Sequence, residues 1–285
     1  MKKARIDAVL AERGLFPSRS AAAGAVRAGE VRVGTDGPVA LRPSQLVEPE
    51  ADFVLQARPR FVSRGGIKLE NALDALGVDV AGRDCLDVGA STGGFTDCML
   101  RRGAERVAAV DVAYGPIDAR PRKDPRVTVI ERLNARALGP ADLPFLASLA
   151  TIDVSFISLD KVLSAVATCL VPGGEVLAMV KPQFELGRER VGRGVVRDAA
   201  DRQEAVLKVA LAARETGLPV RGIASSGLPG PKGNRETFVW CGGEGPGLED
   251  LEGAIAAADV ASLAADGGEA PGSEAAAPGT EGAEE

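Results

Sequence analysis

The chain lacks histidine altogether, and it is poor in aromatic residues. Histidine is the side chain that most often transfers protons near neutral pH, so its absence from all 285 residues excludes histidine-based catalytic triads and histidine-ligated zinc sites. Any catalysis must then depend on Lys, Asp, Glu, Tyr, Ser or Cys. Aromatic residues make up only 4% of the chain, which argues against extensive stacking on nucleic-acid bases.

The sequence also lacks the marks of a secreted or membrane protein. The beginning of the chain, MKKARIDAVLAERG, has no apolar core of a signal peptide. No apolar run approaches the roughly 20 residues that cross a bilayer. The four cysteines are scattered and form no C-x-x-C pair, which argues against a disulfide framework or a zinc site; they are Cys85, Cys98, Cys169 and Cys241. We therefore expect a cytoplasmic protein without a bound metal or a membrane partner.

Basic residues are absent from the C-terminal part of the chain. Residues 243–285 contain 11 Asp or Glu and no Lys or Arg, which dominates the overall net charge of −6. Residues 1–242 hold 34 basic against 29 acidic residues, a net charge of +5. A mildly basic folded part permits a nucleic-acid partner without requiring one.

Composition and periodicity divide the chain into four segments. Residues 1–57 show two helical patterns, then a short alternating strand at 30–34 and an apolar stretch at 46–55. Residues 58–64, RPRFVSR, contain three arginines and one proline, and we interpret them as a basic linker. An α/β unit follows. Residues 264–285 are rich in Gly, Ala, Pro and Glu and are predicted to be a disordered acidic tail.

Residues 65–263 alternate between predicted strands and helices, which is typical of an α/β fold with a parallel-rich sheet covered on both faces. The expected strands are 85–89, 106–112, 126–132, 149–156, 174–180, 220–226 and 236–241. The expected helices are Lys68–Leu76, Phe95–Arg102, Leu159–Leu170, Asp198–Thr216 and Leu248–Leu263. In open α/β sheets ligands bind at the carboxyl ends of the strands, so functional residues are expected there.

The most informative segment is 86–97, LDVGASTGGFTD, where a hydrophobic strand ends in a loop of small residues before a helix. Such a turn points backbone N–H groups toward a ligand, and its glycines allow close approach. Asp111 ends the next strand 22 positions after Gly89, close to the roughly 20 that place a carboxylate on a ribose hydroxyl. The loop predicts a site for a ribose-containing cofactor. The alternative is a glycine-rich turn that only packs tightly.

The glycine spacing distinguishes between cofactors. Dinucleotide folds use G-x-G-x-x-G, whereas this loop reads D-x-G-x-x-x-G-G. That spacing suits a cofactor without phosphates, and S-adenosylmethionine (SAM) is the candidate. The residues expected to hold it are Asp87, Gly89, Ser91, Thr92, Gly93, Gly94, Phe95, Asp111 and Asn134. Asn134 is placed equally well to cap a helix before ARAL.

Four charged residues are expected near the same end of the sheet. Asp153 and Lys181 each end an apolar run, and Glu236 starts a strand after a Gly/Pro-rich loop. Lys68 opens the first helix of the α/β unit. Burial or a nearby cation lowers the pKa of a lysine whereas carboxylates hold it up, so such a cluster can leave one lysine able to accept a proton. The alternative is that each residue is a solvated loop charge.

Taken together, these segments resemble the TlyA (hemolysin A) family of rRNA 2′-O-methyltransferases, from Ala4 to about Asp259. The matching segments are RIDAVLAERGL…SRS, VSRGGIKL, CLDVGASTGGFTD, DVAYG, DVSFISL, VKPQFE and LPGPKGNRETFVW. The resemblance implies an S-four-type RNA-binding domain at 1–57 and an FtsJ-like, Rossmann-like SAM-dependent methyltransferase domain at 65–263. It implies cytidine as the target, in large-subunit rRNA or in both subunits; the full N-terminal helix and the GLEDLEGAI segment favour both.

The resemblance also implies a mechanism. The Lys–Asp–Lys–Glu tetrad of FtsJ-like enzymes falls on Lys68, Asp153, Lys181 and Glu236. A ribose 2′-hydroxyl would attack the methyl carbon of SAM, with Lys181 as base, Lys68 stabilising the oxyanion and the carboxylates orienting both lysines. No metal is needed, because the sulfonium is a good leaving group. A monomer would hold rRNA within ribosomal subunits mainly through phosphates, at Arg5, Arg19, Arg27, Arg60 and Arg64.

Three other interpretations remain open. A haemolysin or pore-former is disfavoured by the missing signal peptide and membrane span. A non-catalytic RNA-binding factor in ribosome assembly is disfavoured because every tetrad and loop residue is present. A Rossmann oxidoreductase is disfavoured by the glycine spacing. Titration with SAM and with NAD would separate the last two.

Overall fold

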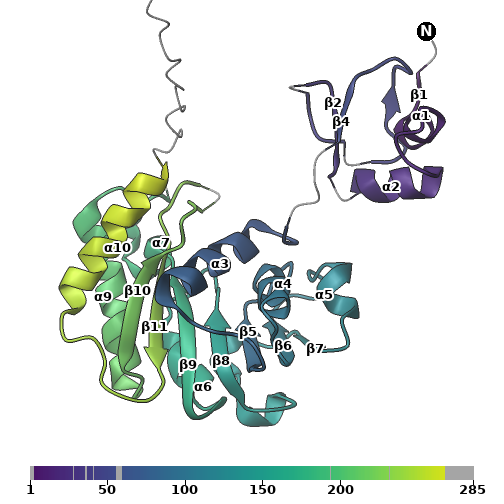
Figure 1. Cartoon of the computed structure of the whole chain (residues 1–285). Helices are drawn as coiled ribbons and strands as arrows, with labels where there is room; N and C mark the ends of the chain where they lie inside the picture. The colour runs from purple at the N-terminus through teal and green to yellow at the C-terminus, as the bar shows by residue number, and fades with distance from the viewer. Residues whose placement is uncertain are drawn as a thin grey trace, which may run out of the picture. The chain divides into compact units, whose positions relative to one another are not determined.

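The computed structural model describes residues 3–27, 29–35, 37–40, 42–55, 60–192, 194–230 and 232–266. It divides the chain into two compact units, Met1–Arg64 and Gly65–Glu285 (Figure 1). Each unit has a hydrophobic core of its own.

The N-terminal unit packs two short helices with two small antiparallel sheets. Its elements are α1 (Ile6–Glu12), α2 (Arg19–Arg27), the pair β1 (Ala4–Arg5) with β3 (Leu46–Val47), and the pair β2 (Val31–Val33) with β4 (Phe53–Leu55). Ile6, Leu10 and Val26 are fully buried in its aliphatic core. The predicted helices and the strand within 30–34 are confirmed. The apolar stretch 46–55 forms two strands rather than one, because a turn separates them.

The second unit contains a seven-stranded sheet in the order β10-β11-β9-β8-β5-β6-β7. Strands β5 to β9 run parallel to their neighbours within that group, whereas β11 runs antiparallel to both β9 and β10. The predicted parallel-rich α/β fold is confirmed. The strands are β5 (Asp84–Val88), β6 (Arg106–Asp111), β7 (Val127–Glu131), β8 (Ala147–Ile152), β9 (Leu170–Val180), β10 (Val220–Ser225) and β11 (Thr237–Gly242).

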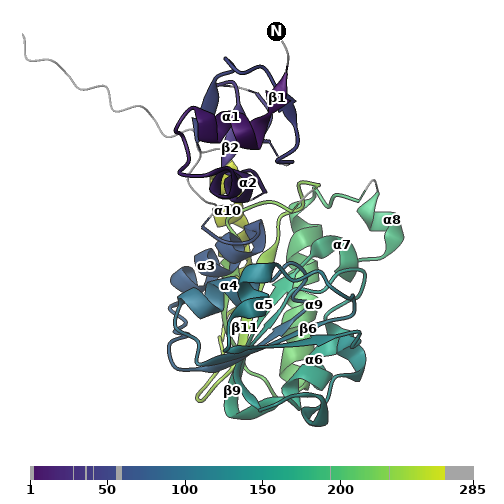
Figure 2. The same ribbon diagram turned by 90° about the vertical axis from the view of Figure 1, so that its right-hand side faces the viewer.

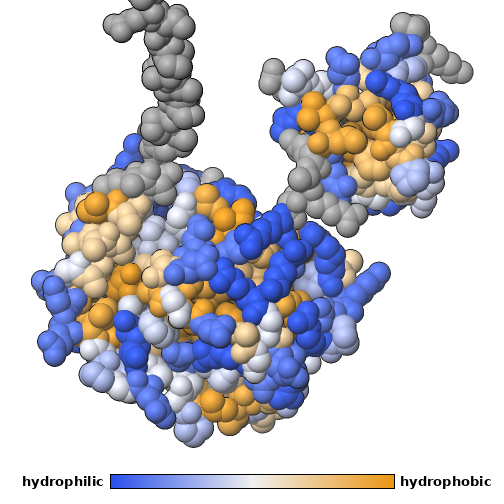
Figure 3. All heavy atoms as spheres, viewed as in Figure 1, coloured by the Kyte–Doolittle hydropathy of each residue, from blue (hydrophilic) through white to orange (hydrophobic). Residues whose placement is uncertain are grey.

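Helices cover both faces of this sheet (Figure 2). One face carries α3 (Arg64–Leu76), α4 (Gly94–Arg101) and α5 (Ala119–Lys123), and hydrophilic side chains gather over α3 and α4 (Figure 3). The other face carries α6 (Asp160–Ala167) and α9 (Ala199–Glu215), and α10 (Leu251–Asp266) packs against α9 and β10. Buried side chains of α6, α9 and α10 form one hydrophobic cluster with the sheet.

Short helices occupy several connections. They are α7 (Pro182–Glu185), α8 (Arg188–Val191) and the 3₁₀ turns η1 (Ala135–Ala137) and η2 (Pro140–Asp142). In the part of the chain that the structure describes, every helix is too short or too polar to cross a membrane.

The predicted start of the first α/β helix is wrong. α3 begins at Arg64 rather than at Lys68, so the last residue of the predicted linker 58–64 is helical. Glycine has a low helix propensity, but Gly66 is buried, and packing of the helix offsets that propensity. Residues 58 and 59 of the linker lie outside the described residues.

The predicted start of the acidic tail is also wrong. α10 continues to Asp266, into the segment 264–285 that was predicted to be disordered. The sequence ASLAAD at the end of this helix is rich in alanine and leucine, which are strong helix formers. Residues 267–285 lie outside the described residues.

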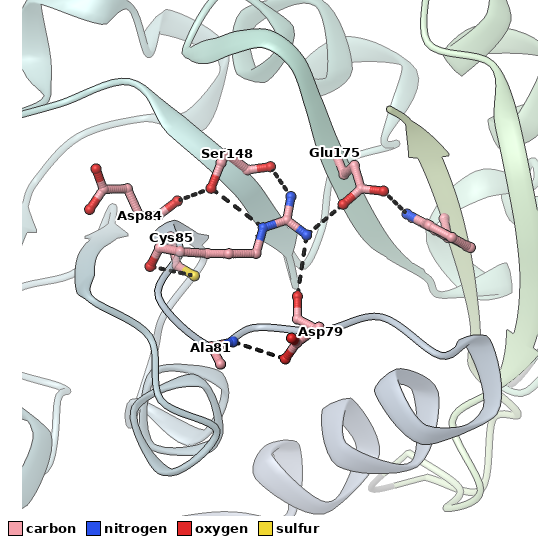
Figure 4. Close-up of polar contacts among 8 residues, drawn as sticks. Asp79, Ala81, Asp84, Cys85, Ser148 and Glu175 are labelled. Carbon is pink, nitrogen blue, oxygen red and sulfur yellow. Dashed lines mark hydrogen bonds and ion pairs between the residues drawn. The ribbon is translucent and has the colours of Figure 1, made fainter. Parts of the chain in front are cut away.

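A polar network joins the amino ends of the parallel strands (Figure 4). Arg83, directly before β5, donates to the carbonyl oxygen of Ser148 on β8 and, at 2.5 Å, to Oε2 of Glu175 on β9. Oε1 of Glu175 accepts a hydrogen bond from Nε1 of Trp240 on β11, at 3.2 Å. The network lies at the opposite end of the strands from the predicted site, so it stabilises the sheet without contributing to that site.

Candidate active site

The loop between β5 and α4 packs closely against neighbouring segments of the chain. Gly89 and Gly93 have φ angles of +86° and +85°, which L side chains rarely adopt. A Cβ atom at Gly89 would lie 2.5 Å from the carbonyl oxygen of Asp153, and one at Gly93 would lie 2.9 Å from Cγ of Pro121. The glycines of this loop therefore allow tight packing, which was the alternative interpretation of the loop.

Asp111, at the end of β6, binds the backbone of the same loop through its carboxylate. Its Oδ2 accepts the backbone N–H of Ser91 at 2.7 Å, and its Oδ1 accepts that of Ala113 at 2.8 Å. Each carboxylate oxygen has a second lone pair, so Asp111 can hold the loop and still accept hydrogen bonds from two hydroxyl groups.

A cleft of about 900 Å³ opens beside this loop, at the carboxyl ends of β5, β6 and β8, and its size is within the roughly 300–1,000 Å³ typical of small-molecule sites. Four of the predicted cofactor residues line it: Gly89, Ser91, Asp111 and Asn134. Asn134 Oδ1 also accepts the N–H of Arg136 at 3.0 Å and caps η1, so it serves as the cap as well as a cleft residue.

The other five predicted cofactor residues do not line this cleft: Asp87, Thr92, Gly93, Gly94 and Phe95. Thr92 is exposed, and Gly94 is the first residue of α4. The ring of Phe95 packs on Phe238 with 5.8 Å between the centroids, on the buried side of the helix. Asp87, Gly93, Gly94 and Phe95 are buried and support the loop from its inner side, whereas Thr92 faces solvent.

Asp87 is fully buried under the loop. The hydroxyl of Thr96 donates to its Oδ2 at 2.6 Å, and that of Thr151 donates to its Oδ1 at 3.4 Å. Burial raises the pKa of Asp87 to about 7, opposed by the Thr96 hydrogen bond and reinforced by the charge of Asp153. Sequence reasoning missed the two threonine partners, since a threonine in a helix or strand has no distinctive pattern.

The four predicted charged residues form two ion pairs. The Nζ of Lys68, on α3, donates to Oε2 of Glu236, and both side chains are buried. The Nζ of Lys181 lies 2.5 Å from Oδ1 of Asp153 and 3.0 Å from the hydroxyl oxygen of Ser155. No side chain of the four is more than 24% exposed, so they are not freely solvated loop charges.

The antiparallel pairing of β9 and β11 brings the Lys68–Glu236 and Asp153–Lys181 ion pairs to the same end of the sheet. Val180 is opposite Thr237, so Lys181 and Glu236 follow this register just beyond the sheet. Gly230 leaves the space for the carboxylate, because a Cβ atom there would lie 2.7 Å from Oε1 of Glu236.

The parallel strands place Asp153 between Lys181 and the glycine loop. Ile152, the last residue of β8, pairs with Ala178 on β9 and with Val88 on β5. Asp153 therefore emerges between the ends of β5 and β9, and its carboxylate lines the cleft. The four charged residues and the glycine loop meet at Asp153.

An exposed aromatic side chain stands at the cleft. Phe156 lines it, is 92% exposed and has a φ angle of +65°. Its ring centroid lies 5.1 Å from that of Phe184, which also lines the cleft. Left-handed backbone at a bulky residue is strained, and such strain clusters at ligand sites. Sequence reasoning missed both residues, because a single Phe in a loop carries no sign of its exposure.

In the N-terminal unit, one buried carboxylate gathers two of the predicted phosphate-binding arginines. Asp7 accepts hydrogen bonds from Arg5 at 2.8 and 3.1 Å, and Nε of Arg19 lies 3.3 Å from its Oδ2. The Arg5 hydrogen bond, with Arg19 assisting, lowers the pKa of Asp7 to about 2. Both guanidinium side chains remain about half exposed. Arg27 is exposed at the end of α2.

The two remaining predicted arginines lie at the boundary between the units. The guanidinium of Arg60 is 5.2 Å from the ring centroid of Phe61, a cation–π distance. Arg64 is the exposed first residue of α3. Neither lines the cleft.

Comparison with known proteins decides between the open interpretations. Residues 61–243 match the model of the FtsJ-like methyltransferases, and residues 4–53 match that of the S4 domain. The chain is 46% identical, over 84% of its own length and 90% of the relative's, to the 16S/23S rRNA (cytidine-2'-O)-methyltransferase TlyA of Mycobacterium tuberculosis. The chain belongs to the TlyA family of FtsJ-like methyltransferases.

Other members of this family carry the haemolysin name. Hemolysin A of Brachyspira hyodysenteriae is 33% identical over 81% of this chain and 97% of its own. A solved structure described as "Putative hemolysin from Streptococcus thermophilus" is 38% identical, covers 93% of this chain and 98% of its own, and superposes with a TM-score of 0.71. Membership confirms a methyltransferase fold, an S4 domain and SAM as the methyl donor, in preference to a nicotinamide cofactor.

Proposed function

We propose that this member of the TlyA family transfers a methyl group from SAM to the ribose 2′-hydroxyl of a cytidine in rRNA. The observation that carries the proposal is the pair of lysine–carboxylate ion pairs at the carboxyl end of the sheet, beside the glycine loop. The M. tuberculosis relative's name gives 16S and 23S rRNA as its substrates, which supports both ribosomal subunits for this chain.

The residues of the cleft fit SAM. Asp111 offers carboxylate oxygens to ribose hydroxyls, and Asn134, Val112 and Leu133 line the same end of the cleft for the adenine. The loop has no phosphate-binding lysine or arginine, which suits a cofactor without phosphates. When bound, SAM supplies a methyl group on a positively charged sulfur that leaves as a neutral thioether.

Lys181 is the residue that takes the proton from the 2′-hydroxyl, once its ammonium group has released a proton to solvent and become a neutral amine. A ribose hydroxyl is a poor nucleophile until its proton is withdrawn, and Nζ of Lys181 is the nitrogen placed beside the cleft residues Asp153 and Ser155. Asp153 and Ser155 fix the position of that nitrogen. Asp153 therefore orients the base toward the cleft rather than reacting itself.

Lys68 stabilises the oxyanion that forms as the proton leaves. Its buried ion pair with Glu236 fixes the direction of the ammonium group, and a fixed charge in a partly buried site stabilises a developing anion without reorganising. All four residues come from one chain, which supports a monomer as the active form.

RNA is held by charge and, at the cleft, by one aromatic surface. Arg5 and Arg19 present guanidinium groups that Asp7 keeps together, and such groups bind phosphates. The exposed ring of Phe156 offers a stacking surface for the base of the target nucleotide. With ribosomal RNA as its substrate, the enzyme would act in the cytoplasm.

Mapping of 2′-O-methyl groups tests the proposal. Purified 30S and 50S subunits from a strain lacking the protein, incubated with the protein and SAM, should gain a methyl group on a cytidine ribose in each subunit. Methylation of a base, or of no residue in either subunit, would contradict the proposal. Methylation of 50S alone would restrict it to the large subunit.

A further inference from the structure

Glu185 is a buried carboxylate that the proposed mechanism does not use. It ends α7, four residues after Lys181, and its side chain is only 1% exposed. It does not line the cleft. A buried carboxylate is costly unless it is paired and hydrogen-bonded, so its partners indicate what it does.

Both oxygens of Glu185 bind the segment that follows Asp153. Oε1 accepts the backbone N–H of Leu159 at 2.9 Å, and Oε2 accepts the hydroxyl of Ser158. Leu159 precedes α6 and supplies no side-chain cap of its own. Glu185 therefore caps α6 from another part of the chain and places a negative charge at the positive end of the helix.

Lys208 ties this cap to the long helix α9. Its Nζ lies 3.5 Å from Oε2 of Glu185 and donates to the hydroxyl oxygen of Ser158 at 2.9 Å and to the carbonyl oxygen of Glu185 at 3.2 Å. Its charge compensates that of the buried carboxylate. The clamp formed by Glu185, Ser158 and Lys208 thus rests on a helix of 17 residues.

The clamp is one of several links between residues 153–159 and residues 181–185. Lys181 forms an ion pair with Asp153 and donates a hydrogen bond to Ser155, and the ring of Phe184 contacts that of Phe156. The clamp binds Ser158 and Leu159, at the C-terminal end of residues 153–159. Loss of Glu185 would therefore loosen the segment that carries Asp153 and Phe156.

We infer that Glu185 is a positioning residue for methyl transfer, which holds residues 153–159 against residues 181–185. This inference rests on the proposed function. Through the clamp, Asp153 keeps Lys181 in place and Phe156 stays at the cleft. A displacement of about 1 Å at reacting groups costs up to roughly 100-fold in rate, so Glu185, which lies outside the cleft, can control the chemical step through the clamp.

The test compares Glu185→Ala and Glu185→Gln with Asp259→Asn. Asp259, on α10, forms a buried ion pair with Arg202 on α9 at 2.6 Å, and neither residue lines the cleft. Both sets of variants therefore replace a buried carboxylate that pairs with a cation of α9, but only one set loosens the clamp. The measurements are single-turnover methylation of ribosomal subunits, SAM affinity by calorimetry, and hydrogen–deuterium exchange of residues 153–159.

We expect Glu185→Ala to lose roughly 10- to 100-fold in single-turnover rate with unchanged SAM affinity and faster exchange in 153–159. Glu185→Gln, which keeps an acceptor for Leu159, should lose less. Asp259→Asn should retain the wild-type rate and the wild-type exchange in that segment. A wild-type rate in Glu185→Ala, or equal losses in Glu185→Ala and Asp259→Asn, would overturn the inference.

Two further comparisons keep the inference testable. If Glu185→Ala does not fold, Glu185→Gln and Ser158→Ala take its place, and wild-type rates in both would contradict the clamp. If the wild-type protein methylates no rRNA, the proposed function fails instead. The exchange measurement needs no substrate, so it tests the clamp in that case too.

Discussion

Lys68 and Glu236 are 168 positions apart in the chain, and their side chains form a buried ion pair between α3 and the residue directly before β11. Removing one partner of a buried pair leaves an uncompensated charge and costs about 3–5 kcal/mol of unfolding free energy. The pair therefore contributes to stability as well as to the proposed chemistry.

These two contributions are separable. Lys68→Met should lower the unfolding free energy and the methylation rate, whereas Lys68→Met combined with Glu236→Gln should recover much of the stability and none of the activity. Urea unfolding and single-turnover methylation measure the two effects. A double variant that regains activity would show that the pair is only structural.

The stability of the protein should depend on the titration of Asp87. Its pKa is about 7 in the folded chain against an ordinary 3.8, so between these values the folded state keeps a proton that the unfolded state releases. The folded state therefore loses stability as pH rises through this window. Asp87→Asn, which stays neutral and still accepts from Thr96, should be more stable than wild type at about pH 8 and equal to it near pH 4. A pH-independent difference in urea unfolding would contradict this account.

The arginines gathered by Asp7 should contribute to RNA affinity through phosphates. Arg5→Ala and Arg19→Ala should each weaken binding to ribosomal RNA and reduce the slope of log K against log salt by about 1. Arg106→Ala is a matched control, because Arg106, the first residue of β6, is also half exposed and paired with a carboxylate, that of Asp84 on β5. An equal loss of RNA affinity in Arg106→Ala would contradict the assignment of phosphate binding to the N-terminal unit.

Phe156 should act in substrate binding and not in cofactor binding. Stacking on an aromatic ring contributes about 1–3 kcal/mol per base, so Phe156→Ala should raise the KM for ribosomal subunits while SAM affinity is unchanged. Phe156→Tyr keeps the ring and should retain function. Unaltered kinetics in Phe156→Ala would exclude a stacking role.

The sequence predicted the parts of the site that depend on local pattern. The glycine loop follows from a strand ending in small residues, and Asp111 follows from its distance along the chain. The sheet and its helices were predictable because segments with the apolar period of strands alternate with segments with the apolar period of helices. Lys68 needed the family resemblance, because a lysine early in a helix usually faces solvent, whereas here the partner Glu236 makes its burial possible.

The sequence could not predict contacts that depend on tertiary register. Glu185, Ser158 and Lys208 come from three separate segments and meet only after β8, β9 and α9 have packed. Phe95 was expected at the cofactor but packs on Phe238, because the helix turns it toward the sheet. The buried state of Asp87 likewise depends on neighbours that local pattern does not reveal.

The most direct test of the account is the response of methyl transfer to the loss of the Lys181 amine. Lys181→Ala removes the base, and Lys181→Arg keeps a positive charge for Asp153 but cannot release its proton. Both variants should lose at least roughly 100-fold in single-turnover 2′-O-methylation while SAM binds with wild-type affinity in calorimetry. Near-normal methylation by either folded variant would contradict the assignment of Lys181 as the base.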